Sequence, residues 1–233
     1  MNTSQILTIL FALVIVIAIV YQIFFNKKAV IKRKLKNAPH KRIYSFRNGE
    51  VAKFTGTVEL VDEPLIAPLS KRKCSYYHVI VEKQVSSGKS SHWKTIIEET
   101  KSCKYVIRDS SACALIKAYV LKSYVVLDKK FSSGAFNDAD ANLENYLNSH
   151  GHESEGFLGF NKTLRYREGI LEQGEKIAVL GKGKWHDAAE AGLPDNYDRV
   201  LVVTASDEHP VYLSDDPSTT KTDRNKRDGR LRR

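Results

Sequence analysis

Cysteine is scarce in this chain, and no catalytic motif is present. The 233 residues include three cysteines, Cys74, Cys103 and Cys113, and no C-x-x-C pair. An odd, widely spaced set favours a reducing compartment over a disulfide framework. There is no phosphate-cradling glycine loop, nucleophile elbow or zinc-protease motif. The sequence therefore predicts no catalytic residue and no cofactor, and it favours a non-catalytic protein.

Acidic residues are missing from one stretch of the chain. Residues 26–42 contain eight Lys and Arg and no Asp or Glu. Residues 221–233 contain seven basic and two acidic residues, so residues 43–220 carry a net charge of −3 within the total of +10. The basicity lies in two flanking segments, which makes nucleic acid an unfavoured partner for the folded part. The polar residues 214–233 predict a disordered basic tail.

Charge is also absent from residues 6–25, a continuous apolar run. Twenty helical residues span about 30 Å, the thickness of a bilayer's hydrocarbon core. A cleaved signal peptide is the competing interpretation, but residues 1–5 lack the basic start that it needs. We therefore expect a transmembrane helix over 6–25, with the lipid bilayer as a partner.

The basic residues after this run predict its orientation. They are Lys27, Lys28, Lys32, Arg33, Lys34 and Lys36. Positive charge on the C-terminal flank predicts a single-pass membrane protein with residues 1–5 outside and the soluble domain cytoplasmic. Apolar residues at helical spacing within 26–42 predict a juxtamembrane helix, which lies either along the membrane or in solvent.

Short runs rich in Val, Ile, Tyr and Thr fill residues 43–213. Broken by turn residues and without long helices between them, they predict a mainly β (α+β) domain, either barrel-like or sandwich-like, with an OB-like barrel as one option. One helix is expected near 137–151, where Leu143, Tyr146 and Leu147 form a buried stripe.

Two groups have side chains that could perform chemistry. His150, His152 and Glu153 are weak candidates for metal ligands, although a solvated loop after the helix is the simpler interpretation. Cys74 and His78 lie four residues apart, about 13 Å along a strand, which is too far for a direct hydrogen bond. The sequence therefore predicts no metal site and an inert Cys74.

Three segments together resemble the GIDE-domain family. They are Asp62–Ser70, with the sequence DEPLIAPLS, Cys74–Tyr77, with CSYY, and Leu171–Gly181, with LEQGEKIAVLG. The family includes mitochondrial membrane ubiquitin ligases, in which a RING follows the domain, and bacterial membrane proteins that lack the RING. The chain resembles the second kind. The resemblance covers roughly residues 51–181.

The sequence lacks the zinc-binding residues of the RING that the ligases of that family carry. A RING holds two Zn²⁺ ions with closely spaced Cys and His pairs, and three separated cysteines cannot supply them. We therefore expect a membrane-anchored, non-catalytic protein-interaction or scaffold module with unknown protein partners. A ubiquitin-ligase-like role and nucleic-acid binding through a barrel face are the alternatives. The expected interaction loop comprises Asp62, Glu63, Pro64, Leu65, Ile66, Pro68, Lys71, Arg72 and Lys73.

Overall fold

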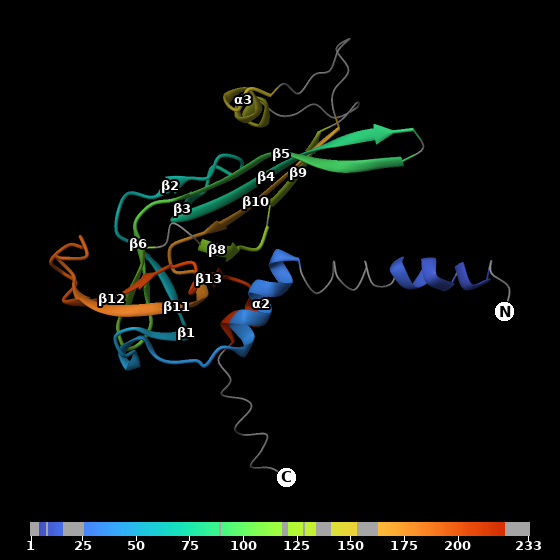
Figure 1. Ribbon diagram of the computed structural model, residues 1–233. Coiled ribbons are helices and arrows are strands. Elements are labelled where there is room, and N and C mark those ends of the chain that lie inside the picture. Colours follow the sequence, from blue (N-terminus) through green and yellow to red (C-terminus); the bar gives the residue numbers. More distant parts are fainter. Residues whose placement is uncertain are drawn as a thin grey trace, which may run out of the picture.

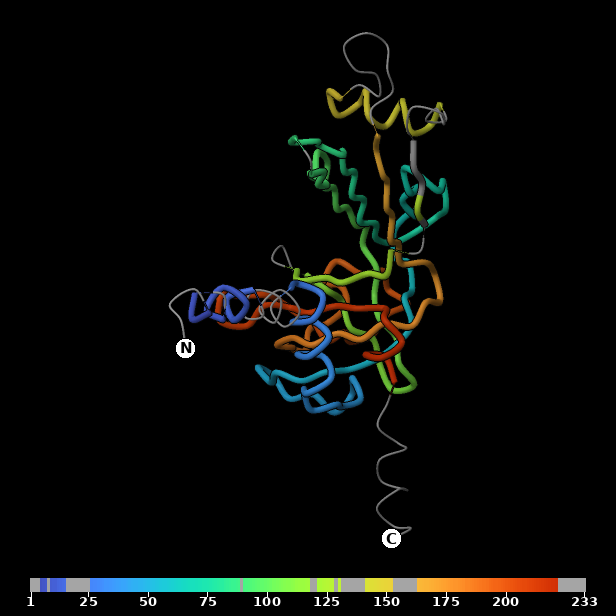
Figure 2. The backbone as a smooth tube through the Cα atoms, turned by 90° about the vertical axis from the view of Figure 1, so that its right-hand side faces the viewer, coloured from blue at the N-terminus to red at the C-terminus, as the bar shows by residue number. Residues whose placement is uncertain are grey.

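The fold consists of a small β-barrel and a four-stranded sheet that stands on it (Figures 1 and 2). Our computed structural model describes residues 5–7, 9–15, 26–88, 90–117, 121–127, 129–133, 141–152 and 163–221. Helix α2 lies beside the barrel, and helix α3 lies over the sheet on the side away from the barrel.

Five strands close the barrel. In order around the ring they are β1 (Glu50–Leu60), β6 (Tyr105–Arg108), β7 (Cys113–Lys117), β12 (Arg199–Thr204) and β11 (Lys176–Asp187). β1 and β11 pair antiparallel and complete the ring, while β7 and β12 pair in parallel. Counted along the chain, the ring order is first, second, third, fifth and fourth, a Greek-key arrangement compatible with an OB-like barrel. The chain is thus mainly β with a small closed barrel.

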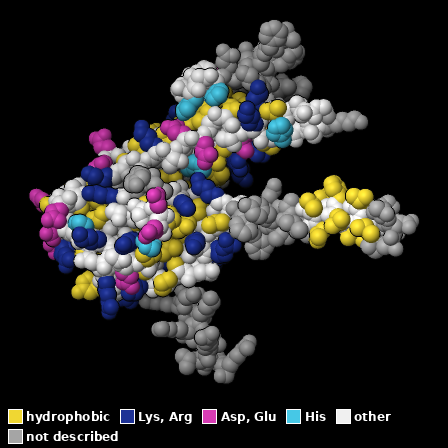
Figure 3. Space-filling view, in the orientation of Figure 1, with side chains coloured by type: hydrophobic (Ala, Val, Ile, Leu, Met, Phe, Trp, Pro, Cys, Tyr) yellow, Lys and Arg dark blue, Asp and Glu magenta, His cyan; other side chains and the backbone are white. Residues whose placement is uncertain are grey.

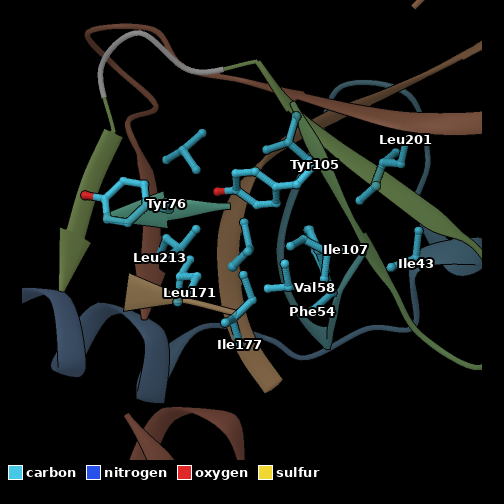
Figure 4. Close-up of a cluster of buried hydrophobic side chains, with 14 of the residues drawn as sticks. Ile43, Phe54, Val58, Tyr76, Tyr105, Ile107, Leu171, Ile177, Leu201 and Leu213 are labelled. Carbon is cyan, nitrogen blue, oxygen red and sulfur yellow. The ribbon is translucent and has the colours of Figure 1, made fainter. Parts of the chain in front are cut away.

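Side chains from all sides of the ring meet in the barrel core. Phe54, Ile107, Ile177 and Leu201 are fully buried and point toward one another (Figure 4). They come from four different strands and alternate with outward-facing residues, as a pleated strand requires. Burial of this apolar surface is the main stabilising contribution to the barrel.

Two strands and three short helices extend the barrel. β11 also pairs with β13 (Val211–Ser214), which pairs in parallel with β8 (Leu121–Tyr124). The helices are α2 (Lys27–Asn37), a 3-10 turn (Ile43–Ser45) and α4 (Pro217–Thr220). Part of the expected disordered tail thus forms α4, and residues 222–233 lie outside the described residues.

Helix α2 is part of the folded body. Ile31 and Leu35 are 1% and 0% exposed and pack against Ala178, Leu180 and Tyr212 of the extended sheet. The apolar spacing that predicts a helix in residues 26–42 therefore serves packing against the barrel, while Arg33, Lys34 and Lys36 remain exposed. Solvent on all sides, one of the two environments expected for this helix, therefore does not describe it.

The second sheet is inserted between the barrel strands. It contains β5 (Ser90–Ser102), β4 (Tyr76–Ser87), β10 (Leu164–Leu171) and β9 (Lys129–Ser133), all antiparallel, and the short β2 (Leu65–Ile66) pairs with β3 (Lys73–Cys74) beside it. Helix α3 (Ala141–Ser149) buries the predicted stripe of Leu143, Tyr146 and Leu147 against this sheet.

Two neighbouring pairs of residues join the barrel to the sheet. Tyr76 of β4 faces Leu171 of β10, and both side chains belong to the barrel core. The next pair, Tyr77 and Ile170, belongs to the core between the sheet and α3. Because successive residues of a strand point to opposite faces, the same two strands contribute to both cores.

The expected transmembrane helix is not found. Among the described residues, no helix is both long and apolar enough to cross a membrane. A helix needs about 20 residues to span the hydrocarbon core, whereas the longest described helical stretch of the apolar run, residues 9–15, reaches only about 10 Å. Residues 16–25 lie outside the described residues, and α2 begins at Lys27 with charged side chains. The predictions of a single-pass protein with an outside N-terminus and a cytoplasmic domain are therefore wrong.

If α2 is integral to the fold, truncation of its buried face must destabilise the whole protein. We expect Leu35→Ala to lower the free energy of unfolding by about 2–5 kcal/mol, because it leaves a cavity against the barrel. Lys34→Ala, on the exposed side of α2, should change it by less than about 0.5 kcal/mol. Urea unfolding of both variants measures this, and equal stabilities would show that α2 is not packed on the barrel.

Candidate functional site

A groove separates the four-stranded sheet from α2. Its volume is about 490 Å³, and it is bounded by Ile80 and Arg167 on the sheet, by residues 123–127 at the end of β8 and just after it, and by Lys27 and Lys28 of α2. The ribbon shows the sheet above and α2 below (Figure 1). In the space-filling view, Lys and Arg side chains gather over α2 (Figure 3).

One row of residues crosses the sheet along the groove. Lys130 of β9 faces Arg167 of β10, Arg167 faces Ile80 of β4, and Ile80 faces Glu98 of β5. All four lie on the face opposite α3, since Val79 and Val81, the neighbours of Ile80, are buried with α3. The strand register thus brings two cations, one apolar side chain and one carboxylate into line.

Arg167 is held by a buried carboxylate on the same face of the sheet, that of Glu82. Its Nη2 donates to Glu82 Oε2 at 2.5 Å, and Arg165 also donates to Glu82 through Nε and Nη2. The hydrogen bond from Arg165 is the largest influence that lowers the pKa of Glu82, against the effect of burial. The Nε of Arg167 is buried and has no hydrogen-bond partner among the described residues. The guanidinium therefore has donor capacity that its own fold does not use.

His78 contributes an imidazole to the same cavity. Its Nε2 lies 3.1 Å from Glu98 Oε1. Burial lowers the pKa of His78, with Lys27 and Arg167 acting in the same direction and Glu98 opposing them. The ring is therefore mostly neutral at neutral pH, and the positive charge of the groove comes from its lysines and Arg167.

The N-terminus of α2 forms the other wall. Asn26 caps the helix by accepting a hydrogen bond from the Ala29 amide at 2.7 Å. Lys27 and Lys28 follow in the first turn, which contains no acidic residue. The Nζ of Lys28 lies 4.8 Å from the centre of the Tyr124 ring. A hydrogen bond with Tyr124 raises the pKa of Lys28.

The floor of the groove depends on a close backbone approach. A Cβ on Gly169 of β10 would lie 2.7 Å from the carbonyl oxygen of Val126, so only glycine lets the floor segment approach the sheet this closely. The amide of Val126 donates to both carboxylate oxygens of Asp215, at 2.9 and 3.0 Å. Burial raises the pKa of Asp215 to about 7, while the Val126 amide opposes this shift.

The expected interaction loop, Asp62–Lys73, does not line the groove. Its centre is pinned to the sheet, because the buried Glu168 accepts hydrogen bonds from the amides of Leu69 and Ser70 at 2.8 and 3.0 Å. Arg72 pairs with Glu172 at 3.2 Å. Five of its residues remain exposed: Asp62, Glu63, Ile66, Lys71 and Lys73.

The basic residues after the apolar run are divided by α2. Lys27 and Lys28 line the groove, and Lys32 pairs with Asp216 at 2.9 Å. Arg33, Lys34 and Lys36 are exposed on the outer side of the helix. Only the first two thus belong to the candidate site.

The weak metal candidates are not brought together as a ligand set. His150 Nε2 lies 3.5 Å from Glu99 Oε2, and its Nδ1 lies 2.9 Å from the carbonyl oxygen of Tyr146. Glu99 also accepts hydrogen bonds from the hydroxyls of Tyr77 and Tyr146, each at 2.7 Å. Glu153 lies outside the described residues, which include no group of three possible metal ligands. The His150 cluster therefore anchors α3 to β5.

A second cavity, of about 540 Å³, lies on the barrel near Tyr44, Trp185 and Tyr197. Both of its arginines contact other side chains of the protein. Arg108 and the Tyr197 hydroxyl both donate to Glu59, and Arg199 lies 5.5 Å from the centre of the Trp185 ring.

Sequence reasoning missed the sheet side of the groove. His78 was considered only as a partner of Cys74, which the structure buries in the core beneath α3 on the other face of β4. Arg167 and Lys130 are separated by 37 positions, and only the strand register brings them together.

Comparison with protein-family models, with curated proteins and with solved structures finds no match.

The pKa of Asp215 predicts how stability depends on pH. The native carboxyl stays protonated up to about pH 7, whereas the unfolded one, with its usual pKa of 3.8, ionises much earlier. The native state therefore binds more protons between pH 4 and 7, and its stability falls as the pH rises through this window. Asp215→Asn retains an acceptor for Val126 and cannot ionise. We expect this variant to exceed the wild type in free energy of unfolding at pH 8 and to match it near pH 4.

Asp216 provides the matched control, because its shift has the opposite sign. Burial opposes the shift, but hydrogen bonds from Ser218 and Lys32 lower the pKa of Asp216 to about 2. Asp216→Asn should therefore reduce stability at pH 8. Urea unfolding at pH 4, 6 and 8 tests both variants, and a destabilised Asp215→Asn at pH 8 would contradict the assignment.

Proposed function

We propose that this protein is a non-catalytic protein-interaction module whose binding site is the groove between the four-stranded sheet and α2. The observation that carries the proposal is the convergence of Lys27, Lys28, Lys130 and Arg167 on one cavity of about 490 Å³. Lys130 and Arg167 are on the four-stranded sheet, and Lys27 and Lys28 are on the capped helix α2, so regular secondary structure positions all four. A preformed site on rigid elements is suited to recognition, because little ordering is needed when a partner binds. The resemblance to GIDE-domain proteins without a RING is consistent with this role.

A ubiquitin-ligase-like role is the less favoured alternative. Burial raises the pKa of Cys74 and of Cys113 to about 11, which disfavours a thiolate nucleophile at either position. A zinc site needs its ligands close together, and these two cysteines lie in different cores of the molecule. Metal analysis of the purified full chain separates the alternatives, since stoichiometric zinc would support a RING-like site.

Nucleic-acid binding through the barrel face rests on one observation, the exposed Tyr44 beside Arg199 in the second cavity. Asp198 lines the same cavity and would repel a phosphate backbone. We therefore place the binding site in the groove, and an oligonucleotide serves as a competing probe below.

The proposal predicts that a partner contacts the groove and not the barrel cavity. A photo-crosslinking amino acid at Leu127, in the groove floor, should give one discrete protein adduct. The same group at Tyr44, which is 75% exposed on the barrel, provides the control. Addition of Ile80→Trp, which fills the groove, should abolish the Leu127 adduct. Equal adducts from both positions, or an adduct that survives Ile80→Trp, would contradict the groove as the site.

A further inference from the structure

We infer that the occupant of the groove is an extended acidic segment of a protein partner, with carboxylates against Lys27, Lys130 and Arg167. The inference rests on the proposed function and adds the chemistry of the partner. It depends on the charge of the lining, the end of α2, the exposed part of Arg167 and the apolar floor.

The charged side chains that line the groove are mostly positive. Lys27, Lys28, Lys130 and Arg167 carry permanent positive charges, and Glu98 is the one carboxylate in the described lining. Glu82 lies beside Arg167 on the same face of the sheet and also pairs with Arg165. Lys27 and Lys130 are exposed, and neither forms an ion pair with another described residue. A carboxylate in the groove would therefore meet cations that the fold leaves unbalanced.

The positive charges in the first turn of α2 interact unfavourably with the helix dipole. A cation at a helix N-terminus is unfavourable, and Lys27 and Lys28 both occupy this position without an acidic neighbour in the turn. Neither lysine caps the helix, because the capping hydrogen bond comes from Asn26. An anion bound between α2 and the sheet would interact favourably with both lysines and with the positive end of the helix.

The Arg167 side chain is partly accessible from the groove. It is 30% exposed, and its Nη2 donates to Glu82 Oε2 at 2.5 Å. Its Nε is buried, so an occupant of the groove would meet the exposed part of the side chain. A carboxylate is the group that a guanidinium binds best.

The length and apolar content of the lining favour a peptide. The row Lys130, Arg167, Ile80 and Glu98 crosses four strands, a distance of about 14 Å, which equals about four residues of an extended chain. Ile80, Val125 and Leu127 provide apolar surface between the charges. Acidic residues would lie at the Lys130 end, and uncharged or apolar residues at the Glu98 end.

The same lining disfavours single-stranded nucleic acid. Sequence-tolerant binding of single strands uses exposed aromatic rings on which the bases stack. Tyr124 is the one Phe, Tyr or Trp in the described lining of the groove, and Lys28 lies over its ring. The groove thus offers charge and apolar contact without a stacking surface.

The test measures binding of three labelled probes to the full chain by fluorescence anisotropy. The probes are an eight-residue peptide of alternating Glu and Leu, the same peptide with Gln in place of Glu, and an eight-residue oligothymidylate. We expect the Glu peptide to bind at least tenfold more tightly than either of the others. Equal binding of the Gln peptide would overturn the inference, and tighter binding of the oligothymidylate would replace the peptide with nucleic acid.

Charge reversals in the groove separate a specific site from general attraction. Lys27→Glu and Lys130→Glu should each weaken binding of the Glu peptide about five- to tenfold. Lys184→Glu, at an exposed position of β11 outside the groove, is the matched control and should leave binding unchanged. Lys27→Glu should also raise the melting temperature, because it replaces an unfavourable charge at the helix N-terminus. If Lys184→Glu weakens binding as much as Lys27→Glu does, the groove is not the site.

Failure of this inference can be distinguished from failure of the proposed function. A discrete adduct from Leu127 that Ile80→Trp abolishes, together with no binding of the Glu peptide, would retain the interaction module and reject the acidic partner. Absence of both the adduct and peptide binding would reject both.

Discussion

The junction between barrel and sheet is the constraint on which the rest of the structure depends. Tyr76 and Leu171 form one cross-strand pair in the barrel core, and Tyr77 and Ile170 form the next pair in the sheet core. Because neighbouring residues of one strand point to opposite faces, neither unit can rotate about the junction without breaking one of the cores. The position of the sheet above α2, and hence the width of the groove, follows from these two pairs.

The groove combines several features that stability alone would not favour. Lys27 and Lys28 oppose the dipole of α2. Asp215 is buried with a raised pKa while it holds the floor segment through Val126, and Arg167 retains a buried, unpaired donor. Each feature costs free energy, and all of them lie in or beside one cavity. Local features that oppose stability usually gather where a protein binds something.

The sequence predicts local features of this fold better than its long-range contacts. Alternating Val, Ile and Tyr runs predict the strands of a small barrel, and the spacing of Leu143, Tyr146 and Leu147 predicts the buried face of α3. The row Lys130, Arg167, Ile80 and Glu98 could not be predicted, because strand register is decided by contacts between distant segments. The packing of the basic segment could not be predicted for a similar reason, since its apolar residues fit a membrane surface as well as they fit the barrel.

Helix α2 determines where part of the unevenly distributed positive charge of the sequence lies in the structure. Ile31 and Leu35 attach a strongly basic helix to a body whose own net charge is slightly negative. Lys32 is balanced by Asp216 of the body, whereas Lys27 and Lys28 extend beyond it toward the sheet. The apolar face of α2 therefore fixes the positions of its cations, and part of its charge is directed into the groove. A flexible basic linker would carry the same charge but could not hold it opposite Arg167 and Lys130.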